Sequence, residues 1–401
     1  MVLRGTTMMK MKKLAYLVAG LVLLSACSAA PGGGKGAAGG GNKQSGDTIK
    51  IGVNLELSGG VAAYGSAEKN GVELAAEQIN KDGGILGKKV KLVVKDNKSD
   101  NNEAATVAAN LVTNDKVVAV IGPATSGATK TVIPNMTKAQ VPVISPSATD
   151  DSITLNGKDV QKYVFRSCFQ DSFQGIMLAD YATNKLKAEK VAILADNSSD
   201  YAIGLTKAFK KEYKGEIVLE ENFTQDDKDF QAVLTKLKGK DFDAIYVPGY
   251  YTQAGLIIKQ ARELGITQPI IGADGFGDEK MVQTAGAQNV NNVFYSTHFS
   301  TKAPATDKVP VFIEAYKAKY NAEPSTFNAL AYDSLYMIKQ AIEDQKSADS
   351  AAIQKGLANL KDFEGVTGTM TIDKNHNPEK SLVILGLTDG KESSAETINA
   401  K

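Results

Sequence analysis

The sequence contains few of the residues on which metal, redox and many hydrolytic sites depend. Its 401 residues include only two histidines and two cysteines. The histidines, His298 and His376, stand far apart in the sequence, and neither lies in a metal-binding or nucleophile-elbow motif. We therefore expect no metal site, no cofactor and no enzymatic activity.

The sequence also lacks an excess of charge and a long apolar run. Lys and Arg total 46 and Asp and Glu total 45, which gives a net charge of +1. Without a basic field, a nucleic-acid partner is not expected. The one marked apolar run, residues 14–24, is too short to span a bilayer as a resident helix.

That apolar run is typical of a signal peptide, because basic residues precede it and small residues follow it. Its end, Leu24-Ser25-Ala26-Cys27, resembles the lipobox of bacterial lipoproteins. The resemblance implies that residues 1–26 are a lipoprotein signal peptide and that the sulfur of Cys27 carries a lipid. An ordinary signal peptide that is cut nearby is the alternative. The true start could be Met1, Met8, Met9 or Met11.

The lipid would hold the protein to the outer side of the cell membrane through a flexible segment. Residues 27–47 are rich in Gly, Ala and Ser and show no apolar periodicity, so they cannot bury enough surface to become ordered. After Cys27 only Cys168 remains, so the mature chain can form no internal disulfide.

The remaining chain, from residue 48, is longer than one typical hydrophobic core, which favours two domains. Apolar periodicity predicts alternating strands and helices. The expected strands are 49–55, 90–94, 117–121, 141–144, 191–194, 244–247 and 269–271. The expected helices are 72–79, 102–112, 126–139, 173–186, 201–213, 230–237 and 254–264, and 309–320 and 327–343 follow, with late strands at 369–372 and 382–387. Repeated β-α-β units predict an α/β protein with parallel sheets in two doubly wound, Rossmann-like lobes.

Four polar loops follow predicted strands, and ligands of such sheets bind at the carboxyl ends of the strands. They are residues 121–127, 143–149, 249–251 and 271–275. Hydroxyls and a helix N-terminus suit a carboxylate, whereas the single acidic side chain of Asp274 suits an ammonium group. Each loop taken singly could be a tight turn with capping residues. Together they indicate a site for a small amino acid.

At this point the sequence resembles the leucine/isoleucine/valine-binding proteins, the class I periplasmic solute receptors of ABC transporters. The matches occur in order along essentially the whole mature chain: LSGGVAAYG at 57–65, AAEQIN at 75–80, GPATS at 122–126, SPSAT at 145–149, GYY at 249–251 and GADG at 272–275. The resemblance implies the periplasmic binding protein type I fold, with a hinge that the chain crosses near Arg166, near His298 and between residues 375 and 380. One lobe would comprise residues 48–166 and 300–376, and the other residues 167–299 and 377–401.

The resemblance also implies which residues bind the ligand. Ser126 and Thr149 match hydroxyl contacts to the ligand carboxylate, and Ser147 and Ala148 offer backbone groups beside them. Asp274 stands where the family places the acidic partner of the ammonium group, although the family often has Glu there. The aromatic positions that would close over the ligand or line its side-chain pocket are Tyr64, Tyr201, Tyr250 and Phe327. Core packing is the alternative for the last three.

These assignments imply a monomeric receptor that captures an amino acid, by family default Leu, Ile or Val, and delivers it to an ABC transporter permease with its ATPase. An extracellular sensor of a small amino acid, amide or related carboxylate is the alternative. An exported hydrolase that uses two carboxylates is less favoured, because Asp274 has no obvious acidic partner in the sequence.

Overall fold

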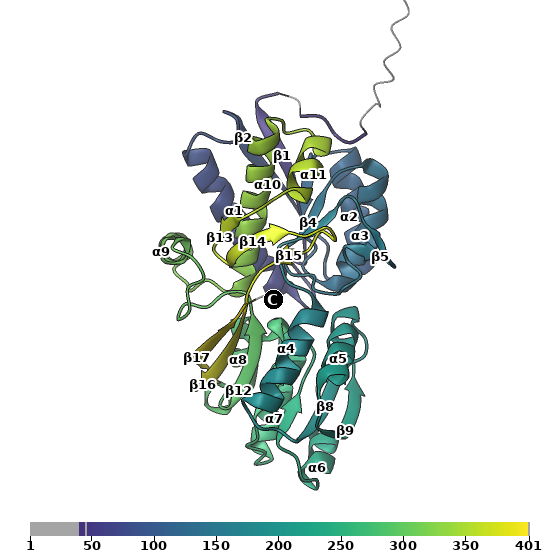
Figure 1. The fold of residues 1–401 in the computed structure, drawn as a ribbon, viewed down its shortest axis with the longest axis vertical. Helices are drawn as coiled ribbons and strands as arrows, with labels where there is room; N and C mark the ends of the chain where they lie inside the picture. The colour runs from purple at the N-terminus through teal and green to yellow at the C-terminus, as the bar shows by residue number, and fades with distance from the viewer. Residues whose placement is uncertain (1–39, 45, 400–401) are drawn as a thin grey trace, which may run out of the picture. The chain divides into compact units, whose positions relative to one another are not determined.

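The computed structural model describes residues 40–44 and 46–399, so the predicted signal peptide and Cys27 lie outside the described residues. The first sheet has five parallel strands in the order β2-β1-β3-β4-β7 (Figure 1). These strands are β1 (Thr48–Leu55), β2 (Lys89–Asp96), β3 (Ala119–Ile121), β4 (Val143–Ser145) and β7 (Val164–Arg166). The helices that connect them are α1 (Ala62–Lys81), α2 (Asn101–Thr113) and α3 (Ser126–Ala139). The central strands are largely buried because helices cover both faces of a parallel sheet.

The second sheet has seven strands in the order β17-β16-β12-β11-β10-β8-β9. Its parallel part consists of β8 (Lys190–Asp196), β9 (Glu216–Phe223), β10 (Ala244–Tyr246), β11 (Ile270–Gly272) and β12 (Val293–Thr297). Its helices are α4 (Asp171–Asn184), α5 (Asp200–Glu212), α6 (Gln231–Lys238), α7 (Tyr251–Glu263) and α8 (Glu279–Ala285), with short 3-10 helices at η1 (Asp274–Phe276) and η2 (Ala287–Asn289).

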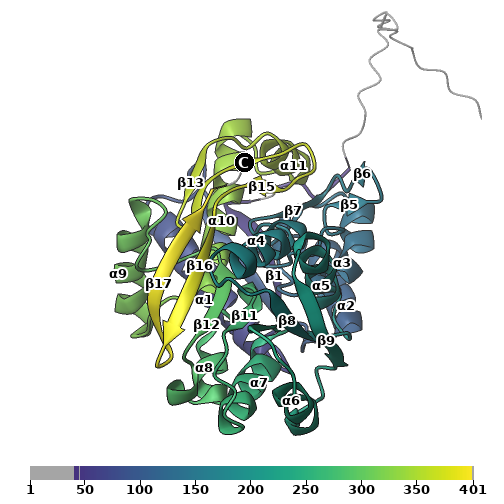
Figure 2. The ribbon, with the colours of Figure 1, turned by 60° about the horizontal axis from the view of Figure 1, so that its bottom comes forward.

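One edge of this sheet is antiparallel. Strand β16 (Leu382–Thr388) pairs antiparallel with β12, and β17 (Lys391–Ile398) pairs antiparallel with β16. Figure 2 shows this hairpin lying along β12.

Between β12 and β16 the chain returns to the first sheet. It forms α9 (Lys308–Tyr320), α10 (Thr326–Gln345), α11 (Ser350–Ala358), β13 (Phe363–Gly365), β14 (Gly368–Ile372) and β15 (Pro378–Glu379). Helix α10 packs along α1 and contacts β3 (Figure 1). A short hairpin, β5 (Leu155–Asn156) and β6 (Asp159–Val160), precedes β7. No helix within residues 40–44 and 46–399 is long and apolar enough to cross a membrane.

The chain therefore passes between the two sheets three times, after β7, after β12 and after β15, which confirms the predicted fold class. Buried polar side chains form hydrogen bonds between the segments that cross from one sheet to the other. The guanidinium of Arg166 donates from Nε to Asn377 Oδ1 at 2.7 Å, and Lys380 Nζ donates to the Ser167 carbonyl at 3.1 Å. The bounds predicted for the two lobes stay a prediction.

Candidate functional site

A small, nearly filled cavity lies where loops of the two sheets meet. Its lining includes most of the residues that the sequence predicted for the ligand site. They are Tyr64, Ser126, Ser147, Tyr201, Tyr250, Asp274 and Phe327, and Ala124, Thr125 and Gly275 complete the wall.

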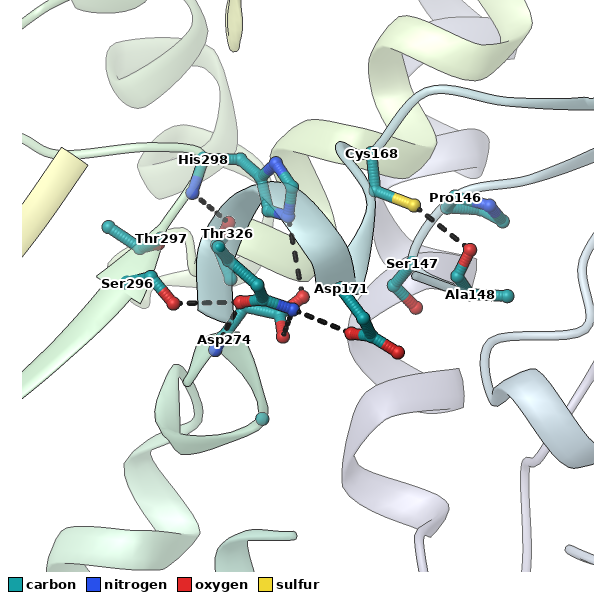
Figure 3. A network of polar contacts seen from close by, with 12 residues as sticks. Pro146, Ser147, Ala148, Cys168, Asp171, Asp274, Ser296, Thr297, His298 and Thr326 are labelled. Carbon is teal, nitrogen blue, oxygen red and sulfur yellow. Dashed lines mark hydrogen bonds and ion pairs between the residues drawn. The ribbon is translucent and has the colours of Figure 1, made fainter. Parts of the chain in front are cut away.

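Two predicted residues, Ala148 and Thr149, lie behind this wall. The carbonyl of Ala148 accepts hydrogen bonds from Arg166 Nη1 at 3.1 Å and from the thiol of Cys168 at 3.3 Å (Figure 3). Thr149 is fully buried. These two residues form part of the loop that supports Ser147.

One end of the cavity is the N-terminus of α3. The N-cap residue Thr125 makes no side-chain cap bond, so the first turn of the helix presents its amide dipoles to the cavity. Ser126 Oγ accepts a hydrogen bond from the Asp150 amide at 3.2 Å, which leaves its hydroxyl hydrogen free to donate. This end can therefore bind an anion such as a carboxylate.

The other end of the cavity is the carboxylate of Asp274 in η1, which is 2% exposed. Tyr201 donates from its hydroxyl to Oδ1 at 2.7 Å, and Gln174 Nε2 donates to the same oxygen at 3.0 Å. His298 Nε2 lies 3.4 Å from Oδ2 (Figure 3). Three groups able to donate converge on one carboxyl, an arrangement that suits an ionised carboxylate.

Gln174, on α4, was not predicted as a site residue. Its amide donates to both Asp274 Oδ1 and Asp171 Oδ1, each at 3.0 Å, and its Oε1 accepts from the Ser296 hydroxyl at 2.7 Å. The side chain thus links two carboxyl groups, one of which, Asp171, is fully buried. Neither residue was predicted to lie beside Asp274, although Asp171 and Gln174 stand three residues apart on one helix face.

Burial decides the protonation of the groups around Asp274. Burial raises the pKa of Asp171, and the nearby charge of Asp274 raises it further. Burial also raises the pKa of Tyr201, so its phenol stays a neutral donor. His298 stacks on Phe169 with 3.5 Å between ring centroids, and burial lowers its pKa to about 4, so it is neutral at neutral pH.

Aromatic rings form the rest of the wall. The rings of Tyr201 and Tyr250 stack with 5.1 Å between their centroids, and the ring centroids of Tyr64 and Phe327 lie 4.4 Å apart. Apart from their hydroxyls these surfaces are apolar and rigid, which suits an aliphatic group.

The described part of the chain contains no cluster of three or more His, Cys, Asp or Glu side chains that could hold a metal ion.

Comparison with known proteins identifies the family of this chain. Residues 48–392 match the family profile described as periplasmic binding protein. The Leu/Ile/Val-binding protein homolog 3 of Brucella melitensis is 34% identical over 86% of this chain and 92% of its own length.

Two solved structures share the fold. The branched-chain amino acid transporter substrate binding protein LivJ of Streptococcus pneumoniae, in complex with isoleucine, is 52% identical with a TM-score of 0.84, and the match covers 88% of this chain and 99% of that one. The leucine binding protein LivK of Thermotoga maritima is 33% identical with a TM-score of 0.82 and the same coverage of both chains. The chain therefore belongs to the leucine/isoleucine/valine-binding protein family of periplasmic binding proteins, whose members are solute-binding proteins and not enzymes.

Proposed function

We propose that this protein is an extracytoplasmic lipoprotein that captures a branched-chain amino acid between its two lobes and delivers it to an ABC transporter permease. The observation that carries the proposal is the polarity of the cavity. An anion-binding helix end with the Ser126 hydroxyl lies on one side, and the Asp274 carboxylate lies on the other.

The two ends of an amino acid fit this arrangement. Both ionic groups leave water on binding, so each needs charge-assisted hydrogen bonds inside the protein. The α-carboxylate would accept from Ser126 and the first amides of α3. The α-ammonium would donate to Asp274, whose position Tyr201 and Gln174 fix.

The side chain of the ligand would lie against the aromatic wall. Tyr64, Tyr250 and Phe327 offer ring surfaces of the kind that packs well on a branched aliphatic group. The isoleucine bound by the pneumococcal relative, at 52% identity, supports the same ligand class here.

Closure of the lobes would complete the site. We assign residues 48–166 and 300–376 to one lobe and 167–299 and 377–401 to the other, so that Ser126 and Asp274 belong to different lobes. The closed form would present a surface to the permease. A lipid on Cys27 would keep the protein, as a monomer, at the membrane.

Calorimetric titration tests the proposal directly. The purified protein, unfolded and refolded to remove carried-over ligand, is titrated with leucine, isoleucine, valine and a panel of other amino acids. We expect micromolar or tighter binding of the branched-chain group and no turnover of any ligand. Absence of binding to every amino acid would contradict the proposed ligand class.

The anchor has a separate test. In cells, Cys27→Ser should move the protein from the membrane fraction to the soluble fraction, and sedimentation of the released protein should give the mass of one chain. If the Cys27→Ser protein stays in the membrane fraction, Cys27 is not the anchor.

A further inference from the structure

Behind the cavity wall, the hydroxyl oxygen of Ser147 lies at hydrogen-bond distance from two other oxygens. Its single hydrogen can form a full hydrogen bond with only one of them. Ser147 Oγ lies 2.5 Å from Glu68 Oε1 and 2.9 Å from the carbonyl oxygen of Ala124. A backbone carbonyl can only accept, and so can an ionised carboxylate. If Glu68 were ionised, one of the two oxygen pairs would be held at hydrogen-bond distance without a hydrogen between them.

A proton on Glu68 resolves this conflict. Glu68 Oε1 then donates to Ser147 Oγ, and the Ser147 hydroxyl donates to the Ala124 carbonyl, so both contacts are hydrogen bonds. The second oxygen, Glu68 Oε2, has no partner among the residues that the structure describes. A buried oxygen without a hydrogen-bond partner costs less free energy on a neutral carboxylic acid than on a carboxylate.

The surroundings of Glu68 also favour the neutral form. Glu68, on α1, is 0% exposed and makes no ion pair with any described residue. Burial raises its pKa well above the ordinary value; the contact with Ser147 lowers the pKa in part, and the neighbouring acid Glu56, just after β1, raises it further.

Glu56 shows the opposite arrangement. Its carboxyl accepts hydrogen bonds from the amides of Ala124 and Thr125, each at 3.0 Å, and from the Thr125 hydroxyl at 2.8 Å. Three donors and no acceptor suit a carboxylate, whereas Glu68 faces a hydroxyl whose hydrogen is used elsewhere. The two neighbouring acids therefore differ in the hydrogen-bonding groups that surround them.

We propose that Glu68 is a positioning residue that carries a proton, donates it in a hydrogen bond to Ser147, and so supports the ligand loop without placing a second negative charge beside the ligand carboxylate. The inference rests on the proposed function, because Ser147 and Ser126 line the same cavity. An ionised Glu68 would repel the α-carboxylate that Ser126 and α3 attract.

The proton can be observed without any ligand. The protein is prepared with ¹³C-labelled glutamate, and the side-chain carboxyl resonances are followed against pH, with Glu68→Gln used to assign the signal. We expect the Glu68 resonance to remain at the position of a protonated acid through neutral pH. The inference is overturned if it titrates near the ordinary value of about 4.3.

Leucine titrations of three proteins test the consequence for binding. In Glu68→Gln the amide can donate to Ser147 as the acid does, so affinity should stay within about twofold of the wild type. Glu68→Ala removes the donor, and affinity should fall by roughly 3- to 10-fold. If Glu68→Gln instead binds leucine more than about tenfold tighter, Glu68 is charged in the native protein and the inference fails.

The two proposals fail in different ways. A wild-type protein that binds no amino acid contradicts the proposed function, while the carboxyl resonance of Glu68 still reports its proton. Leucine binding together with an ionised Glu68 contradicts only the inference.

Discussion

The hydroxyl of Tyr64 donates a hydrogen bond to the carbonyl of Gly275 at 2.5 Å across the cavity. Tyr64 lies on α1 beside the first sheet, and Gly275 lies in η1 beside the second. The Tyr64 oxygen also accepts from the Tyr251 amide at 3.1 Å. One phenol therefore bonds two backbone groups of the opposite side and holds the two lobes together over the site.

Tyr64→Phe should weaken ligand binding while leaving the aromatic wall in place. The change removes two hydrogen bonds of about 0.5–1.5 kcal/mol each, so leucine affinity should fall by roughly 5- to 150-fold. The dissociation constant from calorimetry measures the effect.

Tyr213→Phe is the matched control. The Tyr213 hydroxyl also donates to a backbone carbonyl, that of Ala188 at 2.9 Å, but within the second sheet's own layer. That variant should lower stability and leave affinity unchanged. Equal losses of affinity in both variants would mean that Tyr64 does not act as a contact between lobes.

The sequence predicted helices and strands correctly where the apolar periodicity agrees with the residues that begin or end the element. Residues 126–139 were predicted as a helix and form α3, which Gln140 ends in a left-handed conformation, with Pro134 tolerated inside. Strand β9 was not predicted; it is an edge strand whose apolar run is only three residues long, Ile217 to Leu219, and is followed by three polar residues. Strands β12 and β17 were not predicted either, although β17 pairs with the neighbouring β16 through a short turn at Asp389 and Gly390.

For the site, sequence reasoning identified the loops but not their support. Ser126 and Asp274 follow strands, where ligand-binding residues of α/β sheets are expected. Gln174 and Glu68 lie inside helices and His298 at a crossing, and only burial shows that each faces the loops. Whether a carboxyl is buried, and whether it donates or accepts a hydrogen bond there, depends on contacts between segments some 80 to 100 residues apart.

Asp274→Asn should remove most of the binding energy for the ammonium end. The ligand ammonium would be buried without a charged partner, which costs about 3–5 kcal/mol, so leucine affinity should fall by more than about a hundredfold. Isocaproate, which is leucine without its ammonium group, completes a double-mutant cycle of two ligands and two proteins. The substitution should not weaken the binding of isocaproate.

Asp196→Asn is the control for this substitution, because Asp196 is equally buried in the same lobe but does not line the cavity. Near-normal leucine binding by Asp274→Asn would remove Asp274 from the site.

Ser126→Ala should weaken the carboxylate end. A hydrogen bond to a charged group contributes about 1.5–3 kcal/mol, so leucine affinity should fall by roughly 10- to 150-fold. Leucinamide has no carboxylate, and the substitution should leave its binding unchanged. If leucine and leucinamide lose affinity equally, Ser126 supports the loop rather than contacting the carboxylate.

His298 should make the stability of the protein depend on pH. Burial lowers its pKa to about 4 in the folded protein, against about 6.5 for an unfolded histidine. Between these values the unfolded chain binds more protons at this residue, so the free energy of unfolding falls as the pH drops from about 6.5 to about 4. Above that window the contribution of His298 is complete, and below it no further change is expected. The difference in pKa corresponds to about 3 kcal/mol, since the side chain is fully buried.

Urea unfolding of the wild type and of His298→Gln, at about pH 7.5 and about pH 4, measures this dependence. The wild type should lose about 3 kcal/mol more than the variant between the two conditions. The pKa of His376 is also lowered by burial, but His376 is present in both proteins and cancels in the comparison. The buried acids Asp171 and Glu68, whose raised pKa values act on stability in the opposite direction, cancel in the same way. Equal losses in the two proteins would show that His298 is already charged in the folded state or reaches water there.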